Sequence, residues 1–111
     1  MTDVVLILTT APAGEAGDAI ARALVGERLA ACVNVLAPMT SVYRWQGALE
    51  QDTERQLIIK TTSDHATAVQ ARLRELHSYE LPECLVLKVS DGSAAYLEWV
   101  QAETRIESSD H

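Results

Sequence analysis

The spacing of hydrophobic and polar residues changes several times along this chain, and each period predicts a different element. An unbroken apolar run at residues 4–10 is typical of a central strand that is covered on both faces. Residues 15–28 have a helical period, which predicts an amphipathic helix. Its apolar face comprises Ala16, Ile20, Ala23 and Leu24. Residues 31–36 (ACVNVL) predict a second strand, and Pro38 marks a bend or bulge because proline cannot donate to a ladder.

The middle of the chain, residues 41–62 (SVYRWQGALEQDTERQLIIKTT), predicts a long hairpin. Two strand-forming runs flank Gly47, which tolerates the positive φ that a tight reversal needs. The second arm, residues 49–62, would extend roughly 45 Å at ~3.3 Å per residue, whereas a compact domain of this length is about 35 Å across. Such an arm overhangs its own domain. A projecting strand edge therefore predicts an oligomer whose subunits share the hairpin.

The second half of the chain repeats the pattern of helix and strand. Ser63 or Asp64 is placed to cap a second helix. The apolar stripe of that helix consists of Val69, Leu73 and Leu76. Residues 84–90 (CLVLKVS) predict a further strand, and Ser93 is placed to cap a final helix. The order is therefore β-α-β-β-α-β followed by a helix.

This order is the split βαβ or ferredoxin-like plan. We expect an α+β fold with a four-stranded antiparallel sheet, the long hairpin between its second and third strands, and a C-terminal helix. Right-handed crossovers place the first two helices on one face of the sheet. We expect Leu57 and Ile59 on the other face, where partner subunits would cover them. Residues 1–111 are expected to form one domain, with a flexible tail from about residue 105.

Composition narrows the possible partners. The 111 residues carry a net charge of −7 with only nine Lys and Arg, which do not cluster. An acidic surface repels phosphate backbones and attracts cations, so nucleic acid is not an expected partner. No apolar run approaches the ~20 residues that span a bilayer, and the acidic N-terminal segment does not match a secretory leader. Cys32 and Cys84 have no closely spaced partner and are interpreted as buried reduced thiols.

Candidate metal ligands are few and scattered. A tight site needs three or four converging ligands, and the chain has no CxxC, HxH or HExxH motif. His65, near a helix start, is expected to be solvated, and the terminal His111 can bind only weakly. His77 is the best histidine candidate; its alternative role is a helix-end side chain that the helix dipole favours. Cys32 is a second candidate, with a structural thiol as its alternative role.

Three acids, Glu50, Asp52 and Glu54, alternate along the second hairpin arm and therefore point to one side of the strand. They either discourage edge pairing or recruit divalent ions weakly at the surface. The chain has no GxSxG elbow and no glycine-rich phosphate loop, so we do not expect an enzyme.

An ordered series of motifs resembles the CutA family of divalent-cation tolerance proteins. The motifs are TAP at residues 10–12, AACVNV at 30–35, SVYRWQG at 41–47, LIIKTT at 57–62 and YELPE at 79–83, together with Glu54, Tyr96, Leu97 and Trp99. The resemblance implies a ferredoxin-like subunit in a tight cytoplasmic homotrimer, related in architecture to the PII signalling proteins, whose hairpin reaches the neighbouring subunit. It also implies a role in tolerance of copper and other divalent metals.

The chain departs from the family at one functional site. Some members are described as holding copper through a Cys and a His-His pair. The matching positions here are Thr9, Leu76 and His77, and Ser78 stands where Pro is usual. This three-ligand site therefore cannot be carried over whole.

The resulting hypothesis is a trimeric divalent-cation tolerance protein that binds a divalent metal ion, copper foremost. The predicted metal ligands are His77, Cys32 and Glu54. The predicted inter-subunit pocket consists of Lys60, Tyr43, Trp45, Tyr79 and Glu83. Two alternatives stay open: a PII-like module that binds a small anion or nucleotide beside Lys60, and a trimeric scaffold without chemistry.

Overall fold

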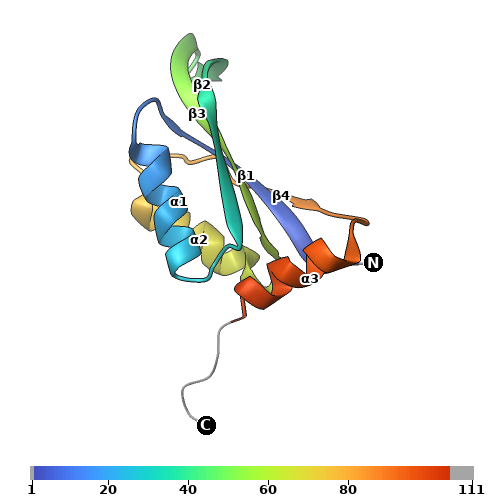
Figure 1. The fold of residues 1–111 in the computed structure, drawn as a ribbon. Coiled ribbons are helices and arrows are strands. Elements are labelled where there is room, and N and C mark those ends of the chain that lie inside the picture. The colour runs from blue at the N-terminus through green and yellow to red at the C-terminus, as the bar shows by residue number, and fades with distance from the viewer. Residues whose placement is uncertain (1, 106–111) are drawn as a thin grey trace.

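The structure, a computed structural model, describes residues 2–105 (Figure 1). In chain order its elements are β1 (Val4–Pro12), α1 (Ala16–Gly26), β2 (Cys32–Trp45), β3 (Ala48–Thr62), the 3₁₀ turn η1 (Ser63–His65), α2 (Ala66–Leu76), β4 (Leu85–Lys88) and α3 (Ala94–Glu103). The tail predicted from about residue 105 lies, apart from Arg105 itself, outside the described residues, as does His111. No helix in the described range is long and apolar enough to cross a membrane.

The four strands form one antiparallel sheet in the order β2-β3-β1-β4. This is the predicted α+β, ferredoxin-like arrangement, with β1 and β3 at the centre. The pairing of β1 with β3 is long, from Val4 opposite Thr62 to Pro12 opposite Glu54. The pairing of β1 with β4 is short and covers only Val5 to Leu8 of β1. Beyond Leu8, β1 therefore has a strand neighbour on the β3 side alone.

Helices α1 and α2 lie along one face of the sheet and bury the main core against it (Figure 1). Leu57 and Ile59 point into this core and are fully buried beside Ile7, Leu24 and Leu73. The prediction that Leu57 and Ile59 lie on the uncovered face was wrong. An alternating pattern defines two faces, but it does not say which of the two receives the helices.

The opposite side of the sheet, which we call the open face, is covered by residues 2–105 only at one end. There α3 packs Val100 onto Val4 and Ala31, and partly buried Leu97 and Val89 complete this smaller cluster. Ser93 caps α3 as predicted, because its side chain accepts a hydrogen bond from the backbone N–H of Tyr96 at 3.4 Å. The rest of the open face carries Leu6, Leu8, Ile58, Leu85 and Leu87, which are partly or fully exposed.

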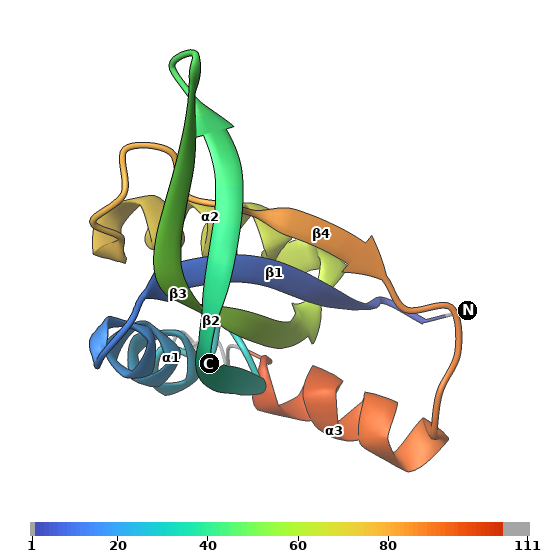
Figure 2. The same ribbon diagram turned by 90° about the horizontal axis from the view of Figure 1, so that it is seen from above.

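The predicted hairpin is present and projects beyond β1 and β4 (Figure 2). It makes the subunit elongated, with extents of 52 × 31 × 23 Å. The reversal uses positive φ angles at Gln46 and Gly47, of 50° and 83°. The bulge predicted at Pro38 is confirmed as a register shift between Val35 and Pro38. Arg55 stabilises this shift by donating to the Leu36 carbonyl at 2.8 Å.

Several element boundaries differ from the prediction. Helix α1 ends at Gly26 rather than residue 28, because Arg28 adopts a left-handed φ of 61° and reverses the chain. Neither Ser63 nor Asp64 caps α2; both belong to the preceding 3₁₀ turn, and the helix starts after His65 without a side-chain cap. Strand β4 is shorter than residues 84–90, since Val89 already packs against the α3 cluster.

Candidate functional site

The eight side chains predicted to form metal and pocket sites gather on the open face or at its rim. The strand register places one group there: Cys32, Lys60, Glu54, Tyr43 and Trp45. The remaining three, His77, Tyr79 and Glu83, belong to the α2–β4 loop (residues 77–84) and contact the sheet near Glu54. Sequence motifs predicted these residues one by one. The fold brings them to one surface.

Lys60 and Cys32 lie opposite each other on β3 and β2. The Lys60 ammonium sits 5.7 Å from the ring centre of Tyr96 on α3, a distance that allows a cation–π contact. No carboxylate of residues 2–105 forms an ion pair with Lys60. Cys32 is free and only partly buried, as is Cys84, so the prediction of buried thiols was only half right. Burial nevertheless raises the pKa of the Cys84 thiol.

The acidic row, which we define as Glu50, Asp52 and Glu54, lies on one side of β3 as predicted. Tyr43, across the hairpin, donates its hydroxyl to the Asp52 carboxylate. This hydrogen bond, with the surrounding negative charge, raises the pKa of Tyr43 to about 12. The row is therefore negative, and the neutral Tyr43 hydroxyl satisfies one Asp52 oxygen without cancelling its charge.

Tyr79 brings a second phenol to the same row. The pKa of Tyr79 lies well above its ordinary value. Burial is the largest cause, and the hydrogen bond to Glu54 and the charge of Glu54 follow. Glu83, from the same loop, accepts a hydrogen bond from Gln56 Nε2 at 3.1 Å. Gln56 was missed in the sequence. The alternation of side chains along β3 could have indicated Gln56, because it shares a face of that strand with Glu54 and Lys60.

The predicted metal ligands His77, Cys32 and Glu54 do not converge within the chain. Cys32 lies opposite Lys60, six residues along β3 from Glu54, which separates the two by roughly 20 Å at ~3.3 Å per residue. Among residues 2–105, no three His, Cys, Asp or Glu side chains are grouped so that they could hold a metal ion. Thr9, which stands where the resemblance places a cysteine in some CutA proteins, is fully buried. Residues 2–105 of one chain therefore do not form a complete metal site.

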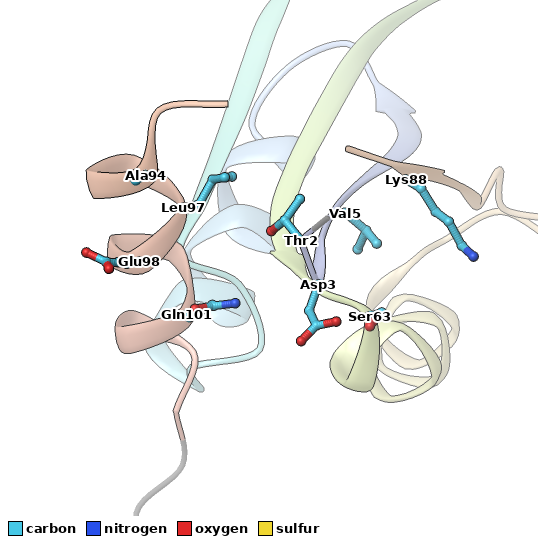
Figure 3. Close-up of a pocket in the computed structure, with 9 residues that line it drawn as sticks. All are labelled: Thr2, Asp3, Val5, Ser63, Lys88, Ala94, Leu97, Glu98 and Gln101. Carbon is cyan, nitrogen blue, oxygen red and sulfur yellow. The ribbon is translucent and has the colours of Figure 1, made fainter. Parts of the chain in front are cut away.

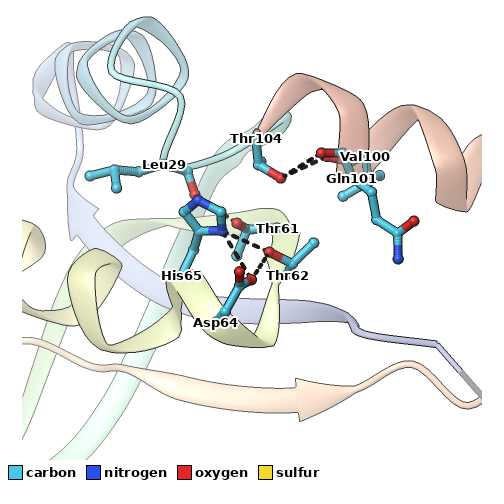
Figure 4. Close-up of polar contacts among 8 residues, drawn as sticks. All are labelled: Leu29, Thr61, Thr62, Asp64, His65, Val100, Gln101 and Thr104. Carbon is cyan, nitrogen blue, oxygen red and sulfur yellow. Dashed lines mark hydrogen bonds and ion pairs between the residues drawn. The ribbon is translucent and has the colours of Figure 1, made fainter. Parts of the chain in front are cut away.

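His65, expected to be solvated, is instead mostly buried, with 14% of its side chain exposed. Its Nδ1 lies 2.7 Å from Thr62 Oγ1 and 3.2 Å from Asp64 Oδ1 (Figure 4). The hydrogen bond from Thr62 is the main cause of a lowered pKa for the Asp64 carboxyl. This cluster lies at the opposite end of β3 from the acidic row. It fastens the β3–α2 junction.

A recess of about 470 Å³ lies between α3 and the ends of β1 and β4 (Figure 3). Leu97 and Gln101 point from α3 toward Thr2 and Asp3, whereas Glu98 points away. None of the eight predicted site residues lines this recess. Its polar groups do not converge on a common point, so the open face remains the candidate site.

Comparison with known proteins decides the family. The family described as CutA1 divalent ion tolerance protein matches residues 5–103. The chain belongs to the CutA1 family. It is 44% identical over 104 residues to the divalent-cation tolerance protein CutA of Thermus thermophilus, covering 94% of this chain and 99% of that protein. It is 43% identical over 105 residues to the protein of the same name from Pectobacterium atrosepticum, covering 95% and 96%.

Solved CutA structures share the fold. A crystal structure of CutA from Xylella fastidiosa superposes with a TM-score of 0.91 at 46% identity, covering 94% of this chain and all of that one. CutA1 from Oryza sativa superposes with a TM-score of 0.91 at 36% identity, covering 96% and 97%. These CutA relatives match the projecting hairpin as well as the body, since nearly the whole length of each chain is covered.

Proposed function

We propose that this CutA1 protein is a cytoplasmic homotrimer that binds divalent cations, Cu²⁺ among them, and thereby contributes to metal tolerance. The observation that carries the proposal is that the eight predicted side chains lie along the open face or at its rim. A surface of this kind is incomplete in one subunit and would be completed by others. The name of the family supports the relevance of divalent cations.

The open face supports self-association because its apolar side chains lack cover. Leu85 and Leu87 of the edge strand β4 are 55% and 46% exposed, and they adjoin Leu8 and Leu6 of β1. Contiguous exposed apolar surface of this kind marks interaction sites. The projecting hairpin adds a long second edge at β2, which a free monomer would leave unpaired.

Charge and ligand chemistry support cation binding between subunits. The net charge of −7 favours cations at the surface. Carboxylate oxygens bind hard divalent ions, and thiolate or imidazole groups add affinity for copper. Because Glu54 and Cys32 are too far apart to share an ion within one subunit, we assign each of them to a site that a neighbouring subunit completes. His77 remains a predicted ligand, although both of its ring nitrogens contact backbone atoms of Thr10 and Tyr79.

The test is native mass spectrometry of the metal-free protein during titration with Cu²⁺. We expect a trimer that takes up ions in multiples of three. Glu54→Gln should reduce uptake, whereas Glu15→Gln, a change of the exposed acid that immediately precedes α1, should not. A monomer, or equal uptake by both variants, would contradict the proposal.

Lys60 supports a second candidate, a PII-like module that binds a small anion. Its ammonium lies on the open face without a carboxylate partner in the described range and next to the Tyr96 ring. A rise in melting temperature with nucleotides or organic phosphates, abolished by Lys60→Gln and absent with metal salts, would favour this candidate.

A further inference from the structure

The α2–β4 loop is fastened to the sheet through His77. The imidazole Nε2 contacts the Thr10 carbonyl on the stretch of β1 that β4 does not reach. The imidazole Nδ1 lies 3.1 Å from the backbone nitrogen of Tyr79, two residues further on. The rings of His77 and Tyr79 also pack together, with centroids 4.4 Å apart.

The partners of the two ring nitrogens define the tautomer. A backbone carbonyl can only accept a hydrogen bond, so Nε2 carries the proton and donates to Thr10. A backbone N–H can only donate, so Nδ1 is unprotonated and accepts from Tyr79. Both nitrogens of the neutral ring are therefore used. Neither has a lone pair that is free for a metal ion while the loop is in this position.

We infer that His77 is a positioning residue, a latch that holds Tyr79 and Glu83 against the open face, and that metal ligation by His77 and this closed loop are mutually exclusive. The second half of the inference rests on the proposed function, because it concerns cations that reach the same surface. The first half stands without any metal.

The latch acts on groups of the candidate site. Tyr79 lies two residues after His77 in this hydrogen-bonded turn and reaches the Glu54 end of the acidic row. At the far end of the loop, Gln56 holds Glu83. Release of His77 would remove the attachment of the loop to Thr10, and Tyr79 would then be held against the sheet by its contact with Glu54, without the support of the His77 ring. A cation that captured His77 would in this way change the surface offered to a neighbouring subunit.

Nitrogen-15 NMR of the metal-free protein tests the latch. Long-range ¹H–¹⁵N correlation distinguishes the two neutral tautomers, and we expect His77 in the Nε2–H form. His65, whose Nδ1 faces the Asp64 carboxylate, is expected with its proton on Nδ1 and serves as the internal control. The variants His65→Gln and His111→Gln assign the three ring signals. A His77 ring protonated on Nδ1 would overturn the inference.

Two substitutions of His77 distinguish its hydrogen bond with Tyr79 from its hydrogen bond with Thr10. Asn places a side-chain oxygen near the position of Nδ1, so His77→Asn should keep the Tyr79 amide protected from hydrogen exchange. His77→Ala should increase exchange of that amide by about fivefold to tenfold, the effect of one lost hydrogen bond. Glu80→Ala, an exposed change in the same loop, is the control. Equal exchange in His77→Ala and the parent would refute the latch.

Zinc titration tests mutual exclusion. If Zn²⁺ shifts the His77 ring nitrogens, the Tyr79 amide should lose protection over the same concentration range. If Zn²⁺ leaves His77 unchanged, protection of the Tyr79 amide should persist. A ring shift with unchanged loop protection would overturn the second half of the inference. Ion counts from native mass spectrometry report separately whether the protein binds metal, so failure of the proposed function is distinguishable.

Discussion

Leu57 and Ile58 are neighbours on β3 and face opposite layers of the protein. Leu57 is fully buried beneath α1 and α2, whereas Ile58 lies partly exposed on the open face, opposite Leu8 of β1. One residue position along the strand therefore separates the core of the subunit from the surface that we assign to assembly. This matched pair allows the two layers to be tested separately.

Truncation of Leu57 should lower the stability of the fold, whereas truncation of Ile58 should weaken assembly. Leu57→Ala leaves a cavity in a close-packed core, and we expect it to lower the free energy of unfolding by about 2–5 kcal/mol. Ile58→Ala should instead shift sedimentation toward smaller species at low protein concentration. Urea unfolding at one fixed protein concentration, with analytical ultracentrifugation, measures both effects. Equal effects of the two variants on unfolding would contradict this assignment.

Gln56 should stabilise the protein more than an exposed glutamine of the hairpin. Its amide donates to the Thr9 carbonyl at 2.6 Å and to Glu83 at 3.1 Å. Gln56→Ala removes both hydrogen bonds, and we expect a loss of about 1–2 kcal/mol in the free energy of unfolding. Gln51→Ala, an exposed change further along β3, should stay within about 0.5 kcal/mol. Chemical denaturation of both variants checks the difference.

The two glycines of α1 should respond oppositely to alanine. A Cβ at Gly17 would lie 3.2 Å from Leu57 Cδ1 and 3.3 Å from Val35 Cγ1, whereas a Cβ at Gly26 would meet nothing within 4 Å. Crowding of a packed core costs about 1–3 kcal/mol, and the gain in helix propensity is at most about 1 kcal/mol. We therefore expect Gly17→Ala to lower the melting temperature and Gly26→Ala to keep or raise it. Differential scanning calorimetry gives both melting temperatures. A higher melting temperature for Gly17→Ala than for Gly26→Ala would show that α1 does not pack closely against Leu57 and Val35.

Asp64 should make stability fall at acidic pH. Its pKa is lower in the folded protein, chiefly because Thr62 donates to the carboxylate and His65 lies beside it. A lowered folded pKa contributes stability that is present above the unfolded value of about 3.9 and is lost as the pH falls through the folded pKa. Since 81% of the Asp64 side chain is exposed, we expect less than about 1 kcal/mol.

Melting curves of the parent and Asp64→Asn between pH 2.5 and 6 measure this contribution. The two proteins should differ most above about pH 5 and converge as the pH falls through the lowered pKa of the folded carboxyl. Thr62→Val, which removes the hydroxyl donor, should shrink the pH-dependent difference. A gap between parent and Asp64→Asn that widens toward low pH would contradict the sign of the pKa shift.

Local patterns in the sequence were sufficient for many features of the fold. The hairpin follows from two strand-forming runs around Gly47, the bulge from Pro38, and the start of α3 from Ser93. The alternation of Glu50, Asp52 and Glu54 was enough to place them on one side of a strand. Each of these features depends on residues close together in the chain, and backbone geometry alone relates them.

Only the tertiary structure decided which side of each strand meets the helices and which residues the loops bring together. The period of two separates Leu57 from Ile58, but the packing of α1 and α2 determines which of them is buried. His77 bonds to Thr10 across 67 positions of the chain, and Gln56 bonds to Glu83 across 27. Contacts of such separation leave no periodic trace in the sequence, because they form only once the sheet register and the helix packing are fixed.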